Sequence, residues 1–137
     1  TMADYTRVVR EKLIFMSYAP IVFISALNGQ RTERILPMID SVYEQSTRRI
    51  KTGVFNDLIG EVTAMHPAPQ YKGRRLKISY ATQVAVQPPE FVLFVNSTDL
   101  IHFSYDRYLE NEIRRAFGFE GTPIRLTFRN KDKNDKL

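Results

Sequence analysis

The first fifty residues carry helical and extended patterns of apolar side chains in turn. Apolar residues at +3 and +4 spacing predict a helix over residues 4–17, with Asp4 as its cap. A short, continuous apolar run then predicts a strand over 20–25 that is buried on both faces. Asn28-Gly29 breaks the chain, and a second amphipathic helix is expected over 32–49.

A lone strand of this kind cannot complete a sheet, because its backbone groups need partners on both sides. Residues 1–50 are therefore predicted to be the end of a larger α/β domain whose other strands are absent. Three hypotheses follow for this segment. It is mobile, it is swapped or packed between two chains in a dimer, or a neighbouring molecule holds it.

Two further helices are predicted in the rest of the chain. The first spans 52–65, with Thr52 as its cap. The second spans 105–117, with Ser104 as its cap and Gly118 at its C-terminus. The first helix is expected to turn four apolar residues inward: Val54, Leu58, Val62 and Met65.

Three strands are expected around these helices, over 75–85, 90–96 and 122–129. Alternation in the first strand predicts one face with Leu76, Ile78, Tyr80 and Thr82, and the other with Lys77, Ser79, Ala81 and Gln83. Alternation in the last strand predicts Ile124, Leu126 and Phe128 inside, and Arg125, Thr127 and Arg129 outside.

The resulting order over 51–129 is α-β-β-α-β, a mixed α/β (α+β) arrangement. Three strands backed by helices can bury one apolar face and stand alone, which leaves the other sheet face available. The polar end of the chain, 130–137, is predicted to be disordered. The chain is thus divided into residues 1–50, 51–129 and 130–137.

Composition argues against a disulfide-stabilised protein, a metal-binding protein and a membrane protein. The 137 residues suit one domain, or one small domain with an appendage, and the lack of cysteine excludes a disulfide framework. With only His66 and His102, far apart in sequence, no metal site is predicted. No apolar run approaches ~20 residues and no signal peptide is visible, so we expect a cytoplasmic protein without membrane contact. The net charge of +5 fits a polyanion partner or an ordinary basic protein.

Several short motifs match nucleotide- or nucleic-acid-binding patterns without their structural context. The D-x-x-G of 57–60 falls inside a predicted helix, and the G-x-x-G of 118–121 joins a helix to a strand. Asn130-Lys131-Asp132 lies in the tail, and no G-x-x-x-x-G-K-[ST] loop occurs. We interpret these matches as a helix, a turn and a tail, and we predict that the chain does not hydrolyse GTP.

No catalytic residues are predicted. His102 and Ser104 lie close together in sequence but not on a strained nucleophile elbow. Glu110 and Glu112 fall on different faces of their helix, so they cannot act as a carboxylate pair. An autonomous small enzyme is therefore the weakest of the interpretations.

A basic cluster is the strongest candidate for a binding function. Four cations lie within six residues: Lys72, Arg74, Arg75 and Lys77. Arg125 and Arg129 are expected to project from the last strand, and they would share the open face with Lys77 if the strands are neighbours. Such residues fit phosphate backbones. A solvated strand face with lysine guarding its edge explains them equally well.

Three stretches of the chain together resemble a known family. They are YAPIVFISALNGQR (18–31), GRRLKISYATQVAVQPPEFVLFVN (73–96) and FSYDRYLENEIRRAFGFEGTPIRLTFR (103–129). These strings are similar to the C-terminal end of the bacterial tandem GTPases called Der or EngA, over about residues 5–129. That family has two Ras-like GTPase domains followed by a KH-like domain, and it serves in assembly of the large ribosomal subunit.

The resemblance implies a role for each part of the chain. Residues 1–50 would be an α-β-α remnant of the second Ras-like GTPase domain, and 51–129 the KH-like domain. Ser25-Ala26-Leu27 is similar to a guanine-binding motif, in which the Ala26 amide would hold the guanine O6. The phosphate loop, switches and N-K-x-D motif lie upstream in the family. The chain itself is thus expected to hold no cofactor, whereas the intact parent binds GTP or GDP and Mg²⁺.

The resemblance also implies partners. Ribosomal RNA of the large subunit would contact the loop over 70–77 and the basic strand face, through Lys72, Arg74, Arg75, Lys77, Arg125 and Arg129. The KH-like domain would also pack on its own upstream GTPase domains. An alternative therefore stays open, in which the domain is chiefly an intramolecular regulatory module with little direct RNA binding.

Overall fold

The computed structural model describes residues 1–132. Its helices are α1 (Met2–Lys12), α2 (Ile35–Ser46), α3 (Thr52–Met65) and α4 (Phe103–Phe117). Its strands are β1 (Gln70–Tyr71), β2 (Arg74–Arg75), β3 (Ile78–Ala85), β4 (Glu90–Val95) and β5 (Arg125–Asn130). Short 3₁₀ turns lie at Ile14–Met16, Thr32–Arg34 and Thr98–Leu100. None of the described helices combines the length and the apolar character needed to cross a membrane.

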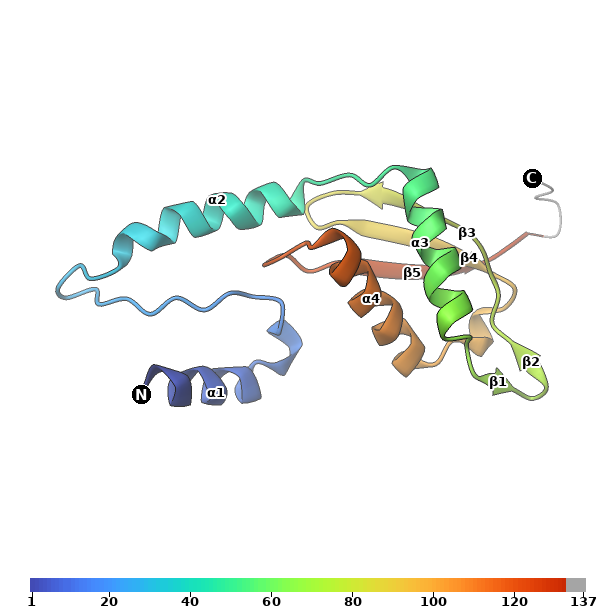
Figure 1. The fold of residues 1–137 in the computed structure, drawn as a ribbon, viewed down its shortest axis with the longest axis horizontal. Helices are drawn as coiled ribbons and strands as arrows, with labels where there is room; N and C mark the ends of the chain where they lie inside the picture. The colour runs from blue at the N-terminus through green and yellow to red at the C-terminus, as the bar shows by residue number, and fades with distance from the viewer. Residues whose placement is uncertain (133–137) are drawn as a thin grey trace.

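The main sheet has the order β3-β4-β5, with β3 antiparallel and β5 parallel to the central strand β4. Helices α3 and α4 cover one face of this sheet (Figure 1). Apolar side chains of both helices meet those of β4 there, and the Phe55 and Phe91 rings stack with centroids 4.5 Å apart. The predicted helix-backed α+β arrangement is confirmed.

A β-bulge reverses the predicted faces of β3. The register runs from Ile78 opposite Val95 to Tyr80 opposite Phe94, so Ser79 is an extra residue without its own partner. A bulge of this kind switches which face the following residues occupy. Ala81, predicted outside, is fully buried in the core, and Tyr80, predicted beside Ile78, lies on the opposite face.

Two amide side chains occupy the free edge of β3. Asn56 of α3 donates to the Ala81 carbonyl at 2.7 Å and accepts from the Ala81 N–H at 2.9 Å. Gln83 accepts from the Ile50 N–H at 2.8 Å and donates to the Arg48 carbonyl at 2.9 Å. The Asn56 bonds satisfy backbone groups of an edge strand and so stabilise that edge against pairing with another chain, whereas the Gln83 bonds fasten the segment before α3 to β3.

The segment before α3 contributes nothing to the buried core. No residue of α1 or α2 is buried, and Ile14, Phe15 and Leu36 are 76%, 70% and 71% exposed. The predicted strand over 20–25 is wrong, since its single bridge joins Ser25 to Gln30. No other extended segment among the described residues lies alongside it, so it cannot form a ladder (Figure 1).

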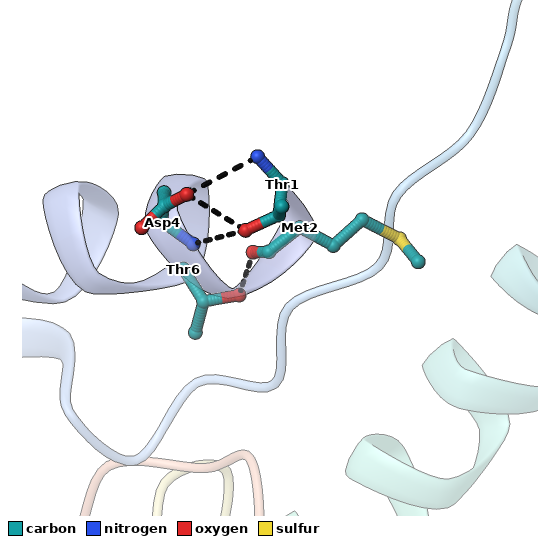
Figure 2. A network of polar contacts seen from close by, with 4 residues as sticks. All are labelled: Thr1, Met2, Asp4 and Thr6. Atoms are coloured by element: carbon teal, nitrogen blue, oxygen red, sulfur yellow. Dashed lines mark hydrogen bonds and ion pairs between the residues drawn. The ribbon is translucent and has the colours of Figure 1, made fainter.

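Helices α3 and α4 closely match their predicted ranges, whereas α1 ends at Lys12 instead of 17 and α2 is shorter than the predicted 32–49. The predicted caps differ more. Thr1 caps α1, while Asp4 occupies the third helical position and accepts bonds from the Thr1 hydroxyl and amino group (Figure 2). These bonds lower the pKa of Asp4. Lys51, not Thr52, precedes α3, and the His102 ring, not Ser104, accepts the capping bond of α4. Gly118 ends α4 as predicted.

The inward face of α3 is rotated from the predicted one. Its buried residues are Phe55, Ile59 and Val62, whereas Val54 is 49% and Met65 67% exposed. Leu58 is only partly buried. The apolar residues of this helix cover more than one stripe, and the sheet selects the stripe that holds the larger Phe55 ring.

Candidate nucleic-acid interface

The β1–β2 hairpin presents three of the six predicted cations to solvent. Its two-residue turn, Lys72-Gly73, has φ values of 50° and 73°, the positive pair that a type I′ turn requires. Lys72, Arg74 and Arg75 are all exposed, and the Lys72 ammonium lies 5.4 Å from the centroid of the Tyr71 ring.

The sheet face opposite the helices is called here the open face. The register places these residues on it: Tyr80, Thr82, Ala85, Glu90, Val92, Phe94, Arg125, Thr127 and Arg129. β4 lies between β3 and β5, so the two outer strands are not neighbours. Arg125 and Arg129 nevertheless project from the predicted side of β5 and are exposed.

Lys77 reaches the same side of the sheet by continuing the line of β3. Its neighbours Leu76 and Ile78 pack into or against the core, so Lys77 faces away from it. The Asn96 N–H donates to the Lys77 carbonyl at 3.1 Å, which places Lys77 beside the end of β4. Asn96 also donates to the Arg75 carbonyl at 3.0 Å and thereby ties the hairpin to this end.

Five of the six predicted residues therefore form a band, and the sixth, Arg125, lies apart from it. Lys72, Arg74 and Arg75 lead from the hairpin to Lys77, and Arg129 lies across β4. Arg125 is separate, since it pairs with Glu90 at the other end of β4.

Three residues that sequence reasoning missed complete the band. Tyr80 and Phe94 are cross-strand partners with ring centroids 6.1 Å apart, and both are half-buried. Lys131 continues β5, donates its N–H to the Val95 carbonyl at 2.8 Å and is exposed. Alternation continued past 129 would have found Lys131, but no sequence signal marked the bulge that moves Tyr80.

The loop predicted to hold guanine is a tight reversal. The Ser25 N–H donates to the Gln30 carbonyl at 3.0 Å, and the Asn28 N–H donates to the Ser25 hydroxyl at 3.3 Å. Leu27 is 94% exposed, and among the described residues the Ala26 amide donates to no other group.

A second polar network joins the first fifty residues to the turn over 118–122, called here the docking turn. Gln45 of α2 accepts from the Phe119 N–H at 3.0 Å, and the Gly121 N–H donates to the Tyr18 carbonyl at 3.1 Å. Arg48 donates to the Phe117 carbonyl and lies 5.5 Å from the centroid of the Phe119 ring.

Arg114 of α4 supports the docking turn from the other side. Its guanidinium donates to the Phe119 carbonyl at 2.9 Å and to the Thr122 carbonyl at 3.0 Å. It also pairs with Glu110 at 3.4 Å and lies 5.3 Å from the centroid of the Tyr18 ring. The G-x-x-G of 118–121 is thus a turn, as interpreted, and its backbone groups are engaged within the chain.

Three further titratable groups near α4 have structural partners. The His102 ring lies 2.6 Å from the Ser104 hydroxyl at the start of α4, and Glu112 pairs with Arg115 at 2.7 Å. Burial raises the pKa of Tyr105, whose hydroxyl donates to the His66 carbonyl. Within residues 1–132, no three His, Asp or Glu side chains group as metal ligands would.

Comparison with known families accounts for this fold. A profile described as "KH-domain-like of EngA bacterial GTPase enzymes, C-terminal" matches residues 49–129. The chain belongs to the EngA family. The docking turn, the hairpin and the whole open face lie within the matched range. The division of the chain into residues 1–50, 51–129 and 130–137 stays a prediction, because the profile match does not test these boundaries.

Individual relatives extend the match toward both ends of the chain. "GTPase Der" of Acetivibrio thermocellus is 57% identical over 133 residues, which cover 97% of this chain and 30% of the relative. "GTPase Der" of Moorella thermoacetica is 55% identical over 129 residues, 94% of this chain and 30% of the relative. The chain thus spans less than a third of the relatives it matches.

Proposed function

We propose that the chain is the C-terminal part of a GTP-binding ribosome biogenesis factor of the cytoplasm, and that it binds ribosomal RNA of the large subunit. The observation that carries this proposal is the exposed band of cations from Lys72 on the hairpin to Arg129 on the open face. Among the residues that the register places on the open face, Glu90 is the single acid. Such a band attracts phosphates by charge alone.

The guanine-binding role of Ser25-Ala26-Leu27 belongs to the same proposal. The exposed Ala26 amide supports recognition of the base, while GTP or GDP phosphates and Mg²⁺ are bound by upstream domains of the intact parent. The nucleotide state of those domains then governs when the cationic band is offered to the ribosome.

A second candidate, an intramolecular regulatory module, is favoured by one observation. The Phe119 and Gly121 amides of the docking turn donate hydrogen bonds to Gln45 and Tyr18 of the preceding segment. In this alternative the domain chiefly positions its own GTPase domains, and RNA contact is incidental.

Sedimentation with large ribosomal subunits separates the two candidates. We expect the chain to pellet with subunits at about 50 mM salt and to be released at about 200 mM. Charge reversal of Arg75, Lys77, Arg125 and Arg129 to Glu should abolish pelleting. Reversal of Arg7 and Lys12 on the exposed face of α1 is the control and should leave pelleting unchanged.

A single charge can be removed from the hairpin without disturbing its turn. Lys72→Asn creates Asn-Gly, the pair that type I′ turns prefer, so the hairpin should persist. The salt dependence of pelleting by the Lys72→Asn variant should be shallower, by an amount that corresponds to the loss of about one phosphate contact. Unchanged pelleting in both the Lys72 variant and the fourfold variant would reject RNA binding through the band and favour the regulatory module.

A further inference from the structure

The open face combines charge with aromatic rings in a way that the basic cluster alone did not indicate. Tyr80 and Phe94 lie side by side at 6.1 Å, with their ring planes inclined by 33°. Neither ring belongs to the core between the sheet and the helices. Each keeps part of its surface in solvent.

Cations surround this ring pair at one end of the sheet. Arg129 pairs directly with Phe94 in the register. Lys77 precedes β3 and Lys131 follows β5, so both lie at the edge of the sheet where β4 ends, on either side of Asn96. At the other end Glu90 pairs with Arg125, so the excess positive charge is concentrated around the rings.

We infer that Tyr80 and Phe94 form a stacking platform for unpaired bases, with Lys77, Arg129 and Lys131 holding the flanking phosphates. Single-stranded RNA is recognised by stacking on aromatic side chains beside a cationic track, whereas duplex bases are not accessible for stacking. This inference rests on the proposed function and names its ligand class: an unpaired stretch of RNA. The docking turn takes no part, because its Phe119 and Gly121 amides are bonded within the chain.

The bulge at Ser79 is what builds the platform. Without the extra residue, regular alternation would carry Tyr80 to the face opposite Lys77 and leave Phe94 alone. With it, both Lys77 and Tyr80 face away from the helices. A local irregularity that re-aims a side chain is typical of binding sites.

The test uses the whole chain and a single introduced indole. The protein contains no tryptophan, so Phe94→Trp supplies the only indole and keeps an aromatic ring at the platform. Tyr43→Trp, at an exposed position on α2, is the control. The probes are an oligouridine of about eight nucleotides and a duplex RNA of the same length.

We expect oligouridine to quench the Phe94→Trp fluorescence and to leave the Tyr43→Trp signal unchanged. In the native sequence, Tyr80→Thr keeps a strand-forming residue and removes the ring, and Phe94→Leu keeps the bulk. Each should weaken oligouridine binding about tenfold and leave duplex binding unchanged. Circular dichroism and urea midpoints establish that both variants are folded.

The outcomes distinguish the inference from the proposed function. Binding that tolerates both ring substitutions but is lost on charge reversal overturns the platform and leaves RNA binding intact. Preference for the duplex, or equal quenching of both indoles, also overturns it. Absence of binding to either RNA and to large subunits overturns the inference together with the proposed function.

Discussion

Substitution of Gly121 is the most direct test of the contact between the docking turn and α2. Its φ is +83°, and an added Cβ would overlap Val42 Cγ2, with Val42 Cβ at 3.3 Å and Pro20 Cδ at 3.4 Å. Val42 is β-branched and held to one preferred rotamer in a helix, so it cannot swing aside. Gly121→Ala therefore meets both backbone strain and a collision with α2.

Gly118 offers a matched control. Its φ is +89°, but an added Cβ would meet only the side-chain ends of Arg48 and Gln45, each at 3.5 Å. Gly118→Ala should cost about 1–3 kcal/mol from backbone strain alone, because φ of 89° with ψ of −92° is a conformation that residues with a Cβ rarely adopt. Gly121→Ala should cost about 2–6 kcal/mol, because overpacking adds about 1–3 kcal/mol to a similar backbone strain.

Urea denaturation measures both costs, and Val42→Ala isolates the collision. In a double-mutant cycle, Val42→Ala should recover about 1–3 kcal/mol of the Gly121→Ala loss, beyond its own cost. If α2 detaches instead, the cost appears as faster hydrogen exchange at the Phe119 amide, which Gln45 otherwise protects. Equal costs at the two glycines, without coupling to Val42 and without faster exchange, would refute the reasoning.

Three other predictions concern separate parts of the chain. Asn56→Ala should cost about 2–4 kcal/mol in urea denaturation, since it leaves both backbone groups of the fully buried Ala81 unpaired; a loss below about 0.5 kcal/mol would contradict the edge-capping role. The pKa of Asp4 is lowered in the folded chain, so its stabilising effect is present above its unfolded pKa and is lost as pH falls through the folded value. Amide exchange in α1 should therefore show more opening at about pH 2 than at about pH 5, but not in an Asp4→Asn variant. The purified chain should release no phosphate from GTP, whereas turnover that survives purification would revive the interpretation as a small enzyme.

Sequence patterns predicted β4 and β5 well because both are regular. β5 alternates without interruption, so Leu126 and Phe128 were assigned inward and Arg129 outward as the structure has them. Alternation mispredicts β3 after Ser79, because a bulge depends on how two strands pair rather than on the composition of one strand. The sequence pattern predicted the candidate cations, but it placed the Tyr80 ring on the face opposite Lys77.

The strand prediction over 20–25 was wrong for a different reason. An apolar run indicates that a strand is compatible with burial, but a ladder requires a second strand to donate and accept hydrogen bonds. Among the described residues none lies beside it, and the run stays extended with one bridge at Ser25. Of the predicted tail, Asn130 ends β5, and residues 133–137 lie outside the described part of the chain.

The docking turn explains why RNA contact would have to come from the sheet. A G-x-x-G clamp works by offering free backbone groups to phosphates. Here the Phe119 and Gly121 amides donate to Gln45 and Tyr18, and their turn is braced by Arg114. Tyr18 also begins the short path through 20–24 to the loop at Ser25. The turn that matches the clamp pattern is therefore engaged within the chain, while the cations around Phe94 stay exposed.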